Sequence, residues 1–272
     1  MRKLDKDYNS VPVSLRTDRE SIARTPAKTT HNRRVEVVAN GAYVYEAKYD
    51  SRYKRVDIKS ALEAIHNYKC AYCEFYDQVL HVEHYRPKNG YHWLAYSWDN
   101  LLLACQKCNG HKKDQFELSG VKVNAPADVD YSRIHSLADE YDAQERPKLI
   151  NPEKVTEDEL NAFIFRQDGS VSSTNERVDY TIRTCDLDRE NLRNMRKKIF
   201  DDLKRSIKYI EYEDALKSWS KGEKQGAYKL ALHEFRENAN DPSSSFTLFR
   251  KYVIKNWFPQ LSNIVGGIHD VV

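Results

Sequence analysis

Four of the five cysteines occur as two equally spaced pairs, and their spacing is the clearest chemical signal in the sequence. Cys70 and Cys73 form one C-x2-C pair, and Cys105 and Cys108 form the second. Four thiolates in two such pairs suit a closed tetrahedral zinc site. Because four cysteines leave no open position for a substrate, we expect this zinc to be structural. The alternative reading is four unrelated buried thiols.

Polar residues that could carry an activity lie between the two pairs and just after the second. Glu83 directly precedes His84, Asn100 stands ahead of the second pair, and Asn109 and Lys112 follow the second pair. Carboxylate and amide oxygens suit Mg²⁺ or Mn²⁺ better than zinc, and a histidine suits general-base chemistry. Adjacent strand residues point to opposite faces, so Glu83 and His84 can serve one site only at a strand end or a bulge. Taken singly, each is more simply a surface or hydrogen-bonded residue.

In this order, and inside a four-cysteine frame, the segments VEHYRP, WDNLLLAC and CNGHKK resemble the HNH (ββα-metal) endonucleases. The resemblance implies an α+β fold with a treble-clef-like core pinned by the zinc. It implies that Glu83 and Asn109 bind a catalytic Mg²⁺ or Mn²⁺. It also implies that His84 takes a proton from water as general base, while Asn100 orients His84 and the hairpin.

The helix after the second cysteine pair supplies the remaining candidates. Lys112 lies three residues beyond Asn109, on the same face of a helix, and the resemblance makes it a phosphate contact. Lys113 is a near-equal candidate for that role. His111 is a weaker metal-ligand candidate, because it faces about 200° away from Asn109 on an ideal helix.

Short elements are expected to position these residues. Apolar spacing predicts a helix over 57–68 that leads to Cys70, and alternation predicts a strand over 78–86. We expect the extended stretch 91–96 to be a partner for that strand. An apolar run at 101–105 precedes an exposed helix over 106–116.

The chain divides into four expected regions. Residues 1–50 are a basic arm, a candidate partner-docking segment, and 51–120 form the HNH core with its zinc site. Residues 121–185 are a connector with short strands and surface character, and 186–272 form a mostly α-helical region. Further expected elements are strands at 35–39 and 42–47, strands in 148–152 and 162–173 around an Asp168-Gly169 turn, and helices from 186, over 227–238 and over 245–257.

Composition bounds the class of protein. The 272 residues are 40% hydrophobic and 31% charged, with a formal net charge of +3. Lys and Arg are in excess over 1–34 and 51–113, which fits either a polyanion-binding face or an ordinary solvated one. The sequence has neither a membrane-spanning apolar run nor a signal peptide, so we expect a cytoplasmic protein without a membrane partner.

A narrower resemblance covers more of the chain. MRKLDK at the start, the core over about 57–117, KLINP with FRQDGSV, and TIRTCDLDRENLRNMRK are together similar to the PtuB family, the HNH nuclease subunits of Septu and retron-associated anti-phage defence systems. That family implies an ABC/OLD-like (PtuA-like) ATPase partner, in some systems with a retron. The basic arm and the carboxy-terminal helices are then the candidate docking surfaces.

Two alternatives stay open at this point. The substrate could be RNA, including tRNA, because HNH chemistry does not need the 2′-hydroxyl. DNA is favoured only because the resemblance to HNH enzymes implies it. A zinc-stabilised adaptor that binds nucleic acid or protein without cutting it would explain the cysteines and the basic segments. It would leave Glu83, His84 and Asn109 without a role.

Overall fold

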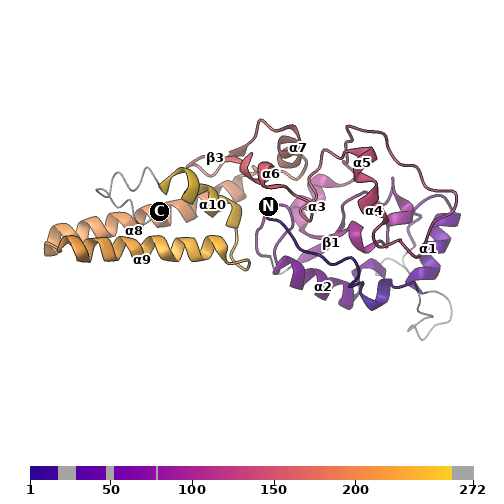
Figure 1. Ribbon diagram of the computed structural model, residues 1–272, viewed down its shortest axis with the longest axis horizontal. Coiled ribbons are helices and arrows are strands. Elements are labelled where there is room, and N and C mark those ends of the chain that lie inside the picture. The colour runs from indigo at the N-terminus through magenta and orange to yellow at the C-terminus, as the bar shows by residue number, and fades with distance from the viewer. Residues whose placement is uncertain (18–28, 47–51, 78, 259–272) are drawn as a thin grey trace.

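A two-stranded antiparallel sheet and the helices around it form one part of the molecule, and a pair of long helices extends from that part (Figure 1). The structure is a computed structural model that describes residues 1–17, 29–46, 52–77 and 79–258. Within these residues, no helix combines the length and apolar character needed to cross a bilayer. In chain order the elements are η1 (Val13–Leu15), α1 (Thr30–Ala39), η3 (Arg52–Lys54), α2 (Val56–His66), β1 (Leu80–His84), η4 (His92–Leu94), η5 (Trp98–Asn100), β2 (Leu101–Cys105), α3 (Gln106–Lys112), α4 (Leu137–Glu140), α5 (Asp142–Glu145), α6 (Glu157–Asn161), β3 (Ile164–Phe165), β4 (Val171–Ser172), α7 (Glu176–Thr184), α8 (Glu190–Lys217), α9 (Lys221–Asn240) and α10 (Thr247–Asn256).

The central hairpin pairs β1 with β2 in an antiparallel register that runs from Leu80 opposite Cys105 to His84 opposite Leu101. All five residues of β2 are buried. The prediction that 91–96 would be the partner strand is wrong, since that stretch contains the short 3-10 helix η4. Its side chains are buried without alternation, whereas the uninterrupted apolar run 101–105 suits a strand covered on both faces.

One cysteine pair precedes the hairpin in the chain and the other follows it, so both lie toward its open end, where Leu80 is opposite Cys105. Helix α2 ends in a left-handed residue, Asn67 at φ 51°, and the next residue also has positive φ, which turns the chain toward the first pair. The backbone N–H of Ala71 donates to the carbonyl of Leu103 at 2.8 Å, so the first cysteine loop is tied to β2. Cys105 ends β2 and is also the N-cap of α3.

The amino-terminal segment folds onto the core. The strand expected at 35–39 is wrong, because these residues lie in helix α1, whose N-cap Thr29 accepts a hydrogen bond from the N–H of Asn32. Buried Arg34 donates to the carbonyls of Leu15 and Tyr96, which joins two parts of the arm to the hairpin loop. Residues 42–46 form no strand, and Ala47 lies outside the described residues, as do 18–28 of the arm.

The segment expected to be a surface connector is anchored in the core by a buried ion pair. Arg86, just after β1, donates to Glu145 at 2.8 Å and to Asp142 at 2.5 Å, and Glu145 is fully buried. Tyr91 donates to the second oxygen of Glu145. The stretch around α4 and α5 is therefore tied to the core through Glu145, while Glu140, Ala143 and Gln144 are exposed.

The carboxy-terminal region is helical, as expected. Helix α8 buries an apolar stripe at three- and four-residue spacing, and α9 packs beside it with α10 against α9 (Figure 1). The Asp168-Gly169 turn joins β3 to β4, so the strands expected in 162–173 are confirmed in shorter form. The strand expected over 148–152 is absent from the described structure.

Candidate active site

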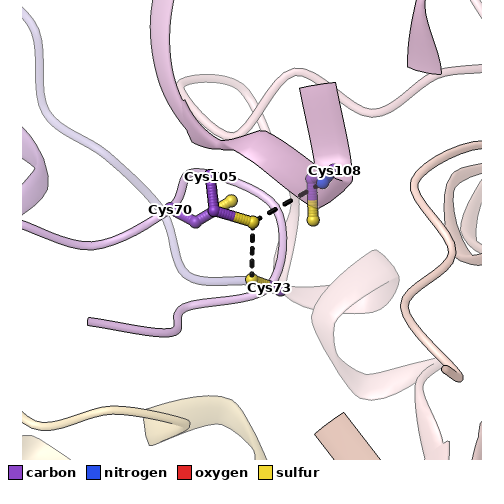
Figure 2. Close-up of side chains that lie close together, drawn as sticks. All are labelled: Cys70, Cys73, Cys105 and Cys108. Atoms are coloured by element: carbon purple, nitrogen blue, oxygen red, sulfur yellow. Dashed lines mark hydrogen bonds between the residues drawn. The ribbon is translucent and has the colours of Figure 1, made fainter. Parts of the chain in front are cut away.

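The four paired cysteines converge into one cluster (Figure 2). Their sulfur atoms all lie within 4.8 Å of one another, Cys73 and Cys105 are 3.9 Å apart, and all four residues are buried. A tetrahedral zinc with Zn–S bonds of about 2.3 Å sets its sulfur atoms roughly 3.8 Å apart. The donor set and spacing of this cluster therefore fit zinc.

The second pair is organised by the start of α3. The backbone N–H of Cys108 donates to the sulfur of Cys105 at 3.5 Å (Figure 2). Hydrogen bonding from the neighbouring thiols, first that of Cys108, lowers the pKa of Cys105. The pKa of Cys73 is lowered as well, whereas the pKa values of Cys70 and Cys108 are raised, so the four thiols share their protons as one interacting group.

An arginine from the carboxy-terminal region also reaches the cysteine cluster, and the sequence analysis did not foresee it. Arg189, the N-cap residue of α8, donates to the sulfur of Cys108 at 3.4 Å and to those of Cys73 and Cys105 at 3.7 Å each. Burial acts to lower the pKa of Arg189, but the sulfurs, that of Cys108 first, raise it above the usual value. No local spacing links this residue to the cysteines, so only the fold reveals the contact.

Glu83 lies on β1 against the end of α3. Its carboxylate is 2.6 Å from the ammonium of Lys112, and both side chains are nearly or completely removed from solvent. Burial raises the pKa of Glu83 above its ordinary value, although Lys112 acts in the opposite direction. A buried carboxylate beside a cation is an oxygen donor that could also serve a hard metal ion.

Lys112 does not have the placement that a phosphate contact needs. Its ammonium is fully buried and donates to the backbone carbonyl of His84 at 2.8 Å as well as pairing with Glu83. This geometry corrects the sequence-based expectation, because the charge is already compensated inside the protein. The neighbouring candidate, Lys113, is exposed.

His84 is the last residue of β1, so it lies at the strand end that the sequence argument required. Its Nε2 is 2.9 Å from the carbonyl oxygen of Ala95, and its ring lies against Tyr53 with centroids 4.7 Å apart. Because a carbonyl only accepts, Nε2 carries the hydrogen and Nδ1 keeps the lone pair. Burial lowers the pKa of His84 to about 3, so the imidazole is neutral near pH 7.

Asn100 closes the loop between the two strands. Its side-chain oxygen accepts from the N–H of Arg86 at 2.8 Å, and its amide donates to the carbonyls of Arg86 at 3.0 Å and Leu94 at 3.3 Å. The residue is completely buried. These bonds fix the backbone on both sides of the loop that begins at His84.

Asn109 and His111 differ in where α3 presents them. Asn109 is partly buried and lies one turn before Lys112, the residue that reaches Glu83, so it shares the helix face turned toward β1. His111 is about half exposed and pairs with Asp186 at 3.2 Å. Helix spacing thus puts Asn109 on the same face of α3 as Lys112, while His111 is engaged by Asp186.

A second cation, Lys88, lies beside His84, and the sequence analysis did not predict it. Lys88 stands over the rings of Tyr43, at 4.4 Å from the centroid, and Tyr53, at 5.1 Å, and its ammonium is 3.4 Å from the Tyr53 hydroxyl. Among the described residues no carboxylate pairs with Lys88. Its position four residues after His84 was the available signal in the sequence.

Comparisons with known proteins agree with this architecture. Residues 70–115 match the HNH endonuclease family. The chain is 25% identical over 303 aligned residues to the Septu protein PtuB of Bacillus mycoides (strain KBAB4), covering 98% of this chain and 94% of that protein. It is 38% identical over 103 residues to the Septu protein PtuB of Bacillus thuringiensis, covering 36% and 37% of the two chains. The expected HNH core with a four-cysteine cluster and a helical carboxy-terminal region is confirmed.

Proposed function

We propose that this HNH endonuclease, which is similar to PtuB along its length, hydrolyses phosphodiester bonds of DNA as the nuclease of an anti-phage defence system. The observation that carries the proposal is that Glu83 and His84 lie at the end of β1, where Lys112 of α3 bonds both the Glu83 carboxylate and the His84 carbonyl, inside the matched segment. An adaptor that only binds would not require a neutral histidine and a buried carboxylate at one strand end.

In this proposal Glu83 and Asn109 hold one Mg²⁺ or Mn²⁺, and the four cysteines hold a structural zinc. A bound divalent ion supplies stabilisation of the charge that develops on the scissile phosphate and its leaving oxygen. His84 accepts the proton of the attacking water at Nδ1, because the Ala95 carbonyl keeps the hydrogen on Nε2. Tyr53 contacts the His84 ring in a T-shaped arrangement and helps to hold its orientation.

The remaining residues position the substrate and the base. Asn100 fixes the loop that carries His84, and Lys112 holds α3 against β1 through Glu83 and the His84 carbonyl. We assign the phosphate contact to Lys88, with exposed Lys113 as the alternative. The support for Lys88 is its uncompensated charge beside the His84 ring, where the two tyrosines hold its ammonium.

The test is a cleavage assay in Mg²⁺ or Mn²⁺ on plasmid DNA, single-stranded DNA and total RNA, run in parallel. We expect the wild type to nick or cut DNA, and His84→Ala to be folded and inactive. Preferential cleavage of RNA would instead assign RNA or tRNA as the substrate. No cleavage of any substrate, with the partner present, would favour the adaptor.

A partner is part of the proposal. Whole-length similarity to PtuB supports an ABC/OLD-like ATPase partner, with a retron in the system as a further option. Helix α8 offers a docking surface, since Tyr209, Tyr212 and Leu216 lie at helical spacing and are each about 60% exposed. Co-purification with the ATPase encoded beside this chain tests the pairing, and Tyr209→Ser with Tyr212→Ser should weaken it. Retained pairing would exclude this face of α8.

A further inference from the structure

Arg189 joins the cysteine cluster to the carboxy-terminal helices, and we infer that it is a positioning residue of the metal site. By donating to three of the four sulfurs, it makes metal binding and docking of the carboxy-terminal helices one coupled equilibrium. The inference rests on the zinc proposed for the four cysteines, and it does not depend on nuclease activity.

Charge gives the first reason. Four thiolates around one Zn²⁺ carry a net charge of two minus in a buried place, which is costly without a compensating cation. The planar guanidinium delocalises its charge over three nitrogens, and two of them contact the sulfurs, with Nη1 on Cys108 and Nη2 on Cys73 and Cys105. A lysine ammonium could not reach three sulfurs with such a fork.

The turn between α7 and α8 holds the guanidinium in place. Nη1 of Arg189 also donates to the carbonyls of Cys185 at 3.3 Å and Asp186 at 2.9 Å, at the end of α7. Two turns further along α8, buried Arg196 donates to the carbonyls of Leu187 and Gly169. The side chain that contacts the sulfurs is thus fixed by the same segment that begins α8.

The first cysteine pair is held to the carboxy-terminal region by its flanking residues as well. Glu74, directly after Cys73, accepts from the backbone N–H of Thr247 at 2.9 Å, at the start of α10. Lys69, directly before Cys70, donates to the carbonyl of Ser244 at 2.6 Å. Both sides of the Cys70–Cys73 loop therefore contact the α9–α10 turn, so a change in this loop on metal loss reaches α10 directly.

Coupling follows from reciprocity. When metal is bound, the anionic sulfurs strengthen the bonds from Arg189 and hold the α7–α8 turn; without metal, neutral thiols are weaker acceptors. By thermodynamic linkage, the free energy by which bound metal stabilises docking of the helices equals the free energy by which docking strengthens metal binding. Loss of a residue that hydrogen-bonds metal ligands commonly lowers metal affinity about 10- to 100-fold.

Zinc competition against a chromophoric chelator on the full chain tests the inference. We expect Arg189→Met to lower zinc affinity about 10- to 100-fold and Arg189→Lys to lower it less. The matched control is Arg193→Met, one turn along α8, where the arginine is about half exposed and pairs with Asp188. This control should bind zinc as the wild type does. Zinc affinity within twofold of wild type in folded Arg189→Met would overturn the inference.

Hydrogen exchange separates this inference from the zinc assignment and from folding failure. In the wild type, removal of zinc should speed exchange over 185–192 and at the start of α10. Arg189→Lys should show fast exchange over 185–192 even with zinc bound. Unchanged exchange in both comparisons would contradict the coupling. If Arg189→Met does not fold, Arg189→Lys decides: zinc affinity and exchange equal to those of the wild type would also contradict it. A wild type that binds no zinc would instead refute the proposed zinc site.

Discussion

Replacing Lys112 with methionine probes the core of the candidate site, because Lys112 joins α3 to β1. Its ammonium is fully buried, 2.6 Å from Glu83 and 2.8 Å from the carbonyl of His84. Methionine keeps most of the apolar stem but removes the charge, which leaves Glu83 buried without its cation. Removing one partner of a buried ion pair costs about 3–5 kcal/mol, so the free energy of unfolding should fall by that amount.

Urea denaturation of the zinc-loaded protein, followed by circular dichroism, measures this loss. Lys113→Met is the matched control, since Lys113 is exposed on the adjacent position and its loss should change stability by about 0.5 kcal/mol or less. The double variant Glu83→Gln with Lys112→Met should lose less than Lys112→Met alone, because it leaves no buried charge. If Glu83 binds Mg²⁺, saturating Mg²⁺ should recover part of the single variant's loss.

Two outcomes would refute the reasoning. A loss below about 1 kcal/mol in Lys112→Met would mean that Glu83 finds water or another donor once the lysine is gone. A double variant as unstable as the single one would mean that the cost comes from packing and not from the unpaired carboxylate. Failure of Mg²⁺ to restore stability would count against Glu83 as a metal ligand while leaving the ion-pair argument intact.

Further predictions concern a buried acid, the phosphate contact and the thiols. Burial raises the pKa of Asp99 to about 7 from 3.8, so the folded state holds a proton that the unfolded state releases, and stability should fall as pH rises from 4 to 7. Asp99→Asn should remove this slope and gain up to about 4 kcal/mol over wild type at pH 8, measured by urea denaturation; equal slopes in both proteins would contradict the assignment. Lys88→Gln should weaken DNA cleavage at least tenfold in a rate assay, whereas Lys107→Gln on the exposed side of α3 should not; equal rates would return the phosphate contact to Lys113. Cys70→Ser should lose zinc in a chelator assay and unfold the core, while Cys185→Ser should keep its zinc; retained zinc in Cys70→Ser would exclude that ligand.

Local patterns in the sequence were sufficient to predict the elements whose defining residues lie close together in the chain. The C-x2-C spacing identified the cysteine cluster, and strand alternation up to His84 identified β1. Helix α8 followed from apolar residues at three- and four-residue spacing. Each of these signals is set by geometry within one or two turns or strands.

The features that the sequence did not predict depend on contacts between residues far apart in the chain, and such contacts leave no local pattern. Residues 35–39 alternate like a strand, but an N-cap at Thr29 and burial of Arg33, Arg34 and Val37 at helical spacing favour α1. Lys112 was predicted to contact phosphate, and no local pattern revealed its partner Glu83, which lies 29 positions earlier, across the hairpin. Arg189 reaches sulfurs more than 80 positions away, so only the packed chain reveals it.

The cysteine cluster and the candidate catalytic site are mechanically one unit because they share the same three elements. Cys105 ends β2 opposite Leu80 and also caps α3, so fixing its sulfur fixes both the hairpin register and the direction of the helix. That register sets His84 opposite Leu101, and the helix direction brings Lys112 onto Glu83. A metal held by the cysteines would therefore set the geometry of residues that it never touches. Since Arg189 contacts the same sulfurs, the coupling inferred above predicts that a partner bound to the carboxy-terminal helices would act on the site through Arg189.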